Sequence, residues 1–268
     1  MAFKEEKMII DAHCHIYPDA IALRAVEGTG NFYHMPLLYD GKHSTLLAAH
    51  DANGVTHAVI FSVATKPQQA ESINRFIAEA ADHSNGRFVG LGTVHPDSEN
   101  IEADIEAILA LGLRGVKLHP DIQRVAIDDP RCLRIYEICE GRLPVLLHAG
   151  DYRFDYSNPS RIAPVLKAFP RLTVIGAHLG GWSVWQEAED TLADFPNFYV
   201  DTSSSLYALT PEKATEIIRR YGADRVMFAT DFPMWDIGEE LGRFDRLSLT
   251  EEERELVLWR NAHALFGF

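Results

Sequence analysis

The sequence predicts an α/β protein that folds as a single-domain (β/α)8 TIM barrel over residues 1–268. Eight short apolar runs recur along the chain, and each is followed by a polar stretch with helical periodicity. The runs are continuously apolar, as in a parallel sheet that is buried on both faces. An open doubly wound sheet is the competing architecture, but no Gly-x-Gly-x-x-Gly motif follows the first run.

The predicted strands and helices alternate in chain order. The strands are expected at residues 8–11, 57–63, 88–94, 115–119, 145–148, 172–178, 198–201 and 225–231. The helices are expected at residues 44–53, 67–83, 98–111, 130–140, 159–168, 182–195, 211–221 and 250–266. Several helices carry start signals: proline near the first turn, Ser98 before Glu102, and Thr250 before three glutamates.

The connection over residues 16–42 is the main irregularity in this pattern. Connections of this length in a barrel usually form lids or substrate walls. We therefore expect it to lie beside the active site.

The charge balance excludes some classes of partner. The chain has 39 acidic and 25 basic residues, which give a formal net charge of -14. Nucleic acids and anionic membranes select basic surfaces, so neither is an expected partner. We expect a small-molecule substrate, and the sequence leaves a homo-oligomer open.

Cysteine usage and the N-terminus favour a cytoplasmic protein. Cys14, Cys132 and Cys139 form no disulfide framework and no Cys-x-x-Cys pair, so we expect three reduced thiols. Cys14 lies between two histidines and should face away from them, because side chains alternate along a strand. The first ten residues do not resemble a signal peptide, and no apolar run reaches the length of a membrane helix.

Histidines gather where the predicted strands end. In a barrel, the carboxyl ends of the strands form one mouth, where active sites are assembled. His13 and His15 would project together from the end of the first strand. The complete set of strand-end candidates is His13, His15, Lys117, His119, His148, His178 and Asp231. Neutral imidazoles and a carboxylate are zinc ligands, so the sequence predicts a metal site at the mouth.

Four motifs carry a resemblance to a known family. They are DAHCH at residues 11–15, LLHAG at 146–150, GAHLGG at 176–181 and ATDFP at 229–233. With them, the chain resembles the amidohydrolase superfamily. It is most similar to the amidohydrolase-related branch that contains aminocarboxymuconate-semialdehyde decarboxylase and several lactonases. The final RNAHALFGF segment also resembles the terminal helix of that branch.

The resemblance implies a ligand set for a zinc-like ion: His13, His15, His148 and Asp231. One zinc ion is expected, with manganese or a two-metal site as alternatives. In mononuclear relatives the residue matching His178 is an acid/base, and in binuclear relatives it ligates a second ion. Asp231 is expected to contact the metal and also to accept a proton from the metal-bound water.

Three further residues are candidates for contacts with the substrate. Lys117 is either a carbamate bridge between two ions, as in binuclear relatives, or a point charge for a substrate carboxylate. His119 either contacts substrate or water, or bonds to the backbone before Pro120. Arg153 either binds a substrate carboxylate or has a role in an exposed loop or in helix packing. Asp11 should face inward beside the metal ligands.

The leading functional hypothesis is a metal-dependent hydrolase. An activated water would attack an amide, ester or lactone of a small molecule, with Asp231 or His178 moving protons. The alternative is a nonoxidative decarboxylase of an aromatic or muconate-like acid, which the same ligands would serve. A barrel that keeps metal only for structure is a third hypothesis, and the open site argues against it.

Overall fold

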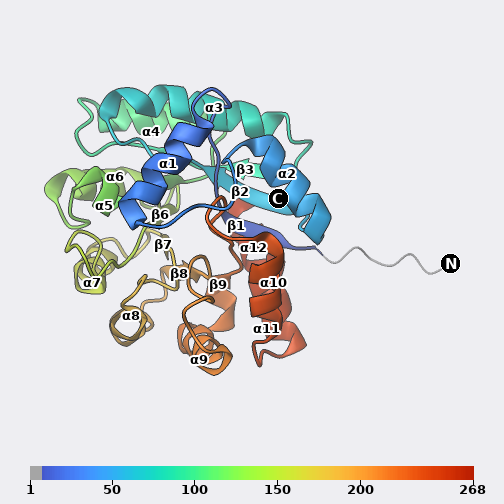
Figure 1. Cartoon of the computed structure of the whole chain (residues 1–268). Coiled ribbons are helices and arrows are strands. Elements are labelled where there is room, and N and C mark those ends of the chain that lie inside the picture. Colours follow the sequence, from blue (N-terminus) through green and yellow to red (C-terminus); the bar gives the residue numbers. More distant parts are fainter. Residues whose placement is uncertain (1–7) are drawn as a thin grey trace.

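The computed structural model describes residues 8–268 and shows a closed barrel of parallel strands inside a ring of helices (Figure 1). The strands are β1 (Ile10–His15), β2 (His57–Phe61), β3 (Phe88–Gly90), β4 (Gly92–Thr93), β5 (Val116–Leu118), β6 (Val145–Leu147), β7 (Val174–Gly176), β8 (Phe198–Asp201) and β9 (Val226–Met227). They form two parallel sheets, ordered β1-β2-β3 and β4-β5-β6-β7-β8-β9.

Two seams join these sheets into one barrel. The predicted third strand is divided at Leu91, whose N–H donates to Ile60 O on β2 at 2.9 Å. The next residue, Gly92, donates to Gly115 O at 2.9 Å and so continues the ladder towards β5. At the other seam, the Ala12 N–H donates to Phe228 O at 2.9 Å, which links β1 to the segment after β9. The predicted (β/α)8 barrel is confirmed.

The helices are α1 (Ala22–Tyr33), α2 (His43–Asn53), α3 (Ala70–Asp82), α4 (Ile101–Ala110), α5 (Pro120–Gln123), α6 (Pro130–Cys139), α7 (Pro159–Ala168), α8 (Trp185–Leu192), α9 (Pro211–Tyr221), α10 (Ile237–Asp245), α11 (Glu251–Glu255) and α12 (Asn261–Phe266). Thr250 and Glu253 form the predicted capping box at α11. At α4 the prediction was wrong, because the cap is Asn100, whose side chain accepts from Ala103 N. Ser98 instead bonds to Asp104.

The long connection over residues 16–42 contains a helix that the sequence pattern did not predict. Gly28 and Gly30 interrupt its middle, and glycine weakens a helical pattern. Figure 1 shows α1 crossing one end of the barrel, inside the ring of outer helices. The short α5 and the helix α10 were also not predicted.

The barrel interior is apolar at the end opposite α1. Ile10, Val59 and Ile175 pack there with Phe266 of α12. A larger cluster fills the layer between the strands and the outer helices. All three cysteines are buried free thiols, as predicted. The open space of the barrel is therefore confined to the mouth, where the strands end.

None of the helices in residues 8–268 has the length and hydropathy needed to cross a bilayer. The prediction that the chain lacks a signal peptide depends largely on residues 1–7, which lie outside the described residues.

Candidate metal centre

Three predicted ligands meet at the mouth of the barrel. The Nε2 atoms of His13 and His15 lie 3.2 Å apart, so β1 projects both rings to one side as expected. Asp231 follows β9, and its Oδ1 lies 3.4 Å from His13 Nε2 and 3.6 Å from His15 Nε2. The three potential ligand atoms lie within 4.8 Å of one another. This group is called the first ligand group below.

The hydrogen bonds of His13 fit a metal ligand. Its Nδ1 lies 2.8 Å from Asp201 Oδ2, and a carboxylate accepts, so Nδ1 carries the proton. The Nε2 atom of His13 then carries no proton, and its lone pair points towards the first ligand group. Burial, more than the nearby Lys117, lowers the pKa of His13 well below its ordinary value, and burial also lowers that of His15. Both rings are therefore neutral, as metal ligation requires.

A second pair lies beside the first ligand group. His148 Nδ1 and His178 Nε2 are 3.0 Å apart. The Nδ1 of His178 lies 3.1 Å from the carbonyl oxygen of Ser203, and this acceptor favours a proton on Nδ1. Nε2 of His178 is then a lone pair. Burial lowers the pKa of His178 to about 4, so this ring is also neutral at pH 7.

His148 completes an arrangement that a cation would satisfy. Its Nε2 is fully buried and has no hydrogen-bond partner among the described residues, while Asp121 Oδ2 lies 3.7 Å away. If Nε2 of His148 carries the proton, that proton faces the Asp121 carboxylate. The lone pair on His148 Nδ1 then faces the lone pair on His178 Nε2. Two lone pairs at 3.0 Å repel each other unless a proton or an ion lies between them. The five predicted ligands therefore form two adjacent groups, which suit one ion or two.

Asp231 is buried, and its two oxygens face different partners. Oδ1 faces the first ligand group, and Oδ2 accepts a hydrogen bond from Ser204. Burial raises the pKa of Asp231 to about 7, although the Ser204 hydroxyl and the Lys117 ammonium oppose this rise. A carboxyl with this pKa exchanges protons readily near neutral pH.

Lys117 supplies a cation at the floor of the mouth. Its side chain is fully buried, with Nζ 3.4 Å from His13 Nε2 and 5.1 Å from the centre of the Phe61 ring. Burial lowers the pKa of Lys117 to about 8, while Asp201 and Asp231 act in the opposite direction. The ammonium is close enough to the ligand groups to meet an anionic ligand there. Carbamylation of Lys117 stays a hypothesis.

His119 has one of the two roles that were proposed for it. Its Nδ1 accepts from Ile122 N at 3.3 Å and caps α5, which is the predicted backbone role. Its ring stacks on His148 at 4.0 Å, and its Nε2 lies 2.8 Å from the Tyr33 hydroxyl. His119 also lines the cavity of the mouth, and its contact with substrate or water stays a prediction.

Arg153 makes packing contacts, which is one of the two roles left open for it. Its guanidinium pairs with Asp151 at 2.6 Å and donates to Phe32 O at 2.8 Å. It also lies over the rings of Tyr33 and Trp182. These contacts hold the end of α1, and Arg153 is not among the residues that line the cavity. Asp151 and the α1 carbonyl thus hold the guanidinium against α1, and a contact with the substrate carboxylate stays a prediction.

Asp201, Asp121, Ser204 and Tyr33 are site residues that sequence reasoning missed. Asp201 ends the predicted strand at residues 198–201, so the strand-end rule could have found it. Asp121 and Ser204 lie just after strand ends, in segments without a motif. Tyr33 comes from α1 within the 16–42 connection, which was expected beside the active site from its length, but no motif singles out this residue.

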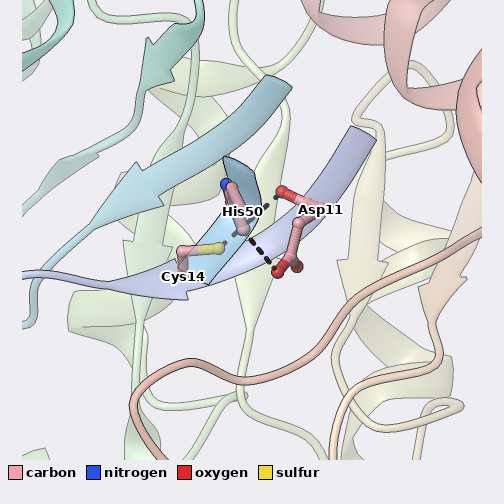
Figure 2. Close-up of side chains that lie close together, drawn as sticks. All are labelled: Asp11, Cys14 and His50. Atoms are coloured by element: carbon pink, nitrogen blue, oxygen red, sulfur yellow. Dashed lines mark hydrogen bonds and ion pairs between the residues drawn. The ribbon is translucent and has the colours of Figure 1, made fainter. Parts of the chain in front are cut away.

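A buried anchor lies behind the ligands, on β1 and α2. Figure 2 shows Asp11, Cys14 and His50 close together, and Nε2 of His50 lies 3.3 Å from Asp11 Oδ2. The carboxylate also accepts from Thr230 N at 2.9 Å, Thr230 Oγ1 at 2.5 Å and His13 N at 3.3 Å. These bonds tie β1 to the residue before the Asp231 carboxylate. With its oxygens already engaged, Asp11 acts as an anchor that positions the ligands.

Replacing Asp201 with asparagine is expected to weaken metal binding about 10–100-fold, because partners of ligand imidazoles fix the tautomer and basicity of the ring. The measurement is the dissociation constant for zinc, by competition with a chromogenic chelator. Asp82→Asn, at an exposed position in α3, is the matched control and should bind as the wild type does. Unchanged affinity in Asp201→Asn would show that this contact does not orient a ligand.

The mouth holds a cavity of about 510 Å³, within the usual range for small-molecule pockets. Its floor is formed by the two ligand groups, Lys117 and His119. Its walls come from α1, from the loop after β2 and from α3. The connection at residues 16–42 therefore forms one wall of the cavity, and its role as a substrate wall stays a prediction.

Comparison with known proteins agrees with this arrangement. The sequence model of the amidohydrolase family matches residues 10–268. Gamma-resorcylate decarboxylase of Polaromonas sp. strain JS666 is 29% identical over 117 residues, which are 37% of this chain and 35% of that protein. The 2-amino-3-carboxymuconate-6-semialdehyde decarboxylase of Dictyostelium discoideum is 32% identical over 91 residues, which are 32% of this chain and 25% of the relative.

A solved structure shares the whole fold. The dihydroxybenzoic acid decarboxylase of Polaromonas sp. JS666, with bound manganese and the inhibitor 2-nitroresorcinol, has a TM-score of 0.72. The sequences are 17% identical, and the alignment covers 97% of each chain. At this identity the similarity establishes the barrel fold alone.

Proposed function

Because the chain belongs to the amidohydrolase family, we propose that it is a metal-dependent nonoxidative decarboxylase of an aromatic or muconate-like acid. The observation that carries this proposal is that both curated relatives are decarboxylases of such acids. Decarboxylation was the alternative hypothesis in the sequence analysis. The leading one, hydrolysis of an amide, ester or lactone, gains no support from these relatives.

The residues proposed to hold the ion are His13, His15, His148 and Asp231, with zinc and manganese as the candidates. Manganese is the ion bound in the similar structure, and neutral imidazoles suit both ions. When bound, the metal would act as a Lewis acid that withdraws charge from substrate oxygen atoms.

Lys117 is proposed to bind the carboxylate of the substrate. Its buried ammonium is the nearest cationic side chain to the first ligand group, 3.4 Å from His13 Nε2. A charge-assisted hydrogen bond from this ammonium would orient the carboxylate. The neutral histidines around it leave its charge free for the substrate.

Asp231 and His178 are the proposed acid/base groups. One of them donates a proton to the ring carbon that carries the carboxylate. The bond between this carbon and the carboxylate then breaks, its electron pair returns to the ring, and CO2 leaves. The proton replaces the carboxylate on the product, so the reaction needs no oxidant. Both side chains line the floor of the cavity.

The first test is CO2 release from 2,6-dihydroxybenzoate, which is gamma-resorcylate, by protein loaded with either metal. Release with stoichiometric formation of resorcinol is the expected result. A parallel screen follows hydrolysis of lactones, esters and amides. Hydrolytic turnover without CO2 release from aromatic or muconate-like acids would contradict the proposal and restore the hydrolase hypothesis.

Replacing His178 with asparagine separates a one-metal site from a two-metal site. For a mononuclear decarboxylase, turnover is expected to fall on the order of 100–10,000-fold, the usual contribution of an acid/base group. One ion per chain should remain, as measured by inductively coupled plasma mass spectrometry. Wild-type protein that holds two ions, and a variant that holds one, would contradict the mononuclear assignment.

The class of substrate, the cellular location and the oligomeric state are also proposals. A small-molecule substrate fits a cavity of this size. The cytoplasmic location and the homo-oligomer stay predictions from the sequence.

A further inference from the structure

The cavity continues beyond the metal ligands into a space between α1 and α3, which we call the outer chamber. It is lined by Ile21, just before α1, by Ala25 and Gly28 of α1, and by Ile73 and Phe76 of α3. The ligands lie at the other end of the same cavity. A bound molecule can therefore reach both regions at once.

The outer chamber differs chemically from the floor. The floor carries imidazoles, a carboxylate and the Lys117 ammonium, whereas the outer walls are mainly apolar. Ile21 is 40% exposed, and Ile73 and Phe76 are only partly buried. Of the residues that α1 and α3 contribute to the lining, Arg24 is the charged one, and its side chain is exposed. Covering these apolar surfaces favours an apolar ligand group.

We propose that the substrate carries an uncharged apolar substituent on the side remote from its carboxylate, and that this substituent occupies the outer chamber. The inference rests on the proposed decarboxylase function, because the carboxylate must lie at the floor beside Lys117. The opposite end of a planar acid then points out of the floor towards α1 and α3.

Gly28 is a place where this space can be closed. No heavy atom lies within 4 Å of the position that a Cβ would take there. Gly28 is inside α1 and lines the cavity, so a larger side chain would enter open space instead of the packed core. Leucine is also a better helix former than glycine. Gly28→Leu should therefore fold and fill part of the outer chamber.

The test compares two ligands that differ only in the apolar group: 2,6-dihydroxybenzoate and its 4-butyl derivative. Their dissociation constants for the metal-loaded protein are measured by calorimetry. The butyl compound is expected to bind at least about tenfold more tightly, because each buried methylene group favours binding about fourfold. Equal affinity, weaker binding or no binding of the butyl compound would overturn the inference.

Two variants locate the effect. In Gly28→Leu, the ratio of the two dissociation constants should fall towards one. Gly242→Leu is the matched control, because Gly242 is also a helical glycine with no atom within 4 Å of a Cβ, and it is exposed on α10 away from the cavity. It should keep the wild-type ratio. An unchanged ratio in Gly28→Leu would place the butyl group elsewhere and overturn the inference.

Two other outcomes distinguish an error in the chemistry of the outer chamber from an error in the decarboxylase proposal. A 4-carboxylate derivative that binds more tightly than the butyl compound would show that the chamber selects an anion through Arg24, against the inference. CO2 release is measured separately for both ligands. Tighter binding of the butyl compound without CO2 release from either would support the apolar chamber and contradict the decarboxylase proposal.

Discussion

Replacing His13 with alanine is expected to remove the metal and to lower turnover on the order of a thousandfold or more. His13 Nε2 lies within 3.4 Å of His15, Asp231 and Lys117, so it is central to the first ligand group. Loss of the ion would cost several kcal/mol of transition-state stabilisation, and each 1.4 kcal/mol is about tenfold in rate. The measurements are metal content per chain and CO2 release.

The His13→Ala variant should still fold, although with a lower free energy of unfolding. The Asp201 carboxylate would lose its partner at 2.8 Å, and an unsatisfied buried acceptor costs about 1–3 kcal/mol. Circular dichroism and thermal melting of the metal-free proteins test this point. His83→Ala, at an exposed position after α3, is the control and should keep both metal and activity. Stoichiometric metal in both His13→Ala and His148→Ala would refute the ligand assignment.

Replacing Lys117 with methionine is expected to lower kcat/KM about a hundredfold while the metal stays bound. Hydrogen bonds to charged groups contribute up to about 3 kcal/mol, and this one would be lost with the ammonium. Methionine has nearly the volume of lysine, but loss of the ammonium leaves Asp201 and Asp231 without a nearby cation, so the variant is expected to be less stable. The measurements are kinetics with 2,6-dihydroxybenzoate and metal content per chain.

The metal content of this variant also tests the carbamate hypothesis. A carbamylated Lys117 that bridges two ions predicts two ions in the wild type and loss of one in Lys117→Met. One ion in both proteins supports the point-charge role. The control is Lys167→Met, because Lys167 is exposed on α7 and lies over the Phe195 ring, away from the cavity. A wild-type kcat/KM in Lys117→Met would remove this residue from substrate binding.

The hydrophobic pattern of short sequence windows predicted the positions of most strands and helices of the barrel. Strands and helices alternate with periods that are visible in a short window, so α7 and α9 begin and end at the predicted residues. The third strand was predicted as one element and is divided at Leu91. The pattern failed for α1, since its glycines resemble loop residues. Its contacts with the mouth are long-range: the Phe32 carbonyl accepts from Arg153, and the Tyr33 hydroxyl lies 2.8 Å from His119 Nε2.

The sequence by itself determined which side chains stand at the barrel mouth. In a parallel barrel every strand ends at the same side, so the position of a residue at a strand end fixes its place, and His13, His148, His178 and Asp231 were found in this way. The motif order also identified the family, which the match over residues 10–268 confirms.

Only the tertiary structure decided how these side chains face one another. His13 takes its orientation from Asp201, which is 188 residues away along the chain. His148 faces His178 instead of joining the first ligand group, and Arg153 is occupied by Asp151 and α1. Ring orientation and hydrogen-bond partners depend on packing between distant segments. Hydrophobic periodicity is a property of each segment by itself, so it cannot predict contacts between distant segments.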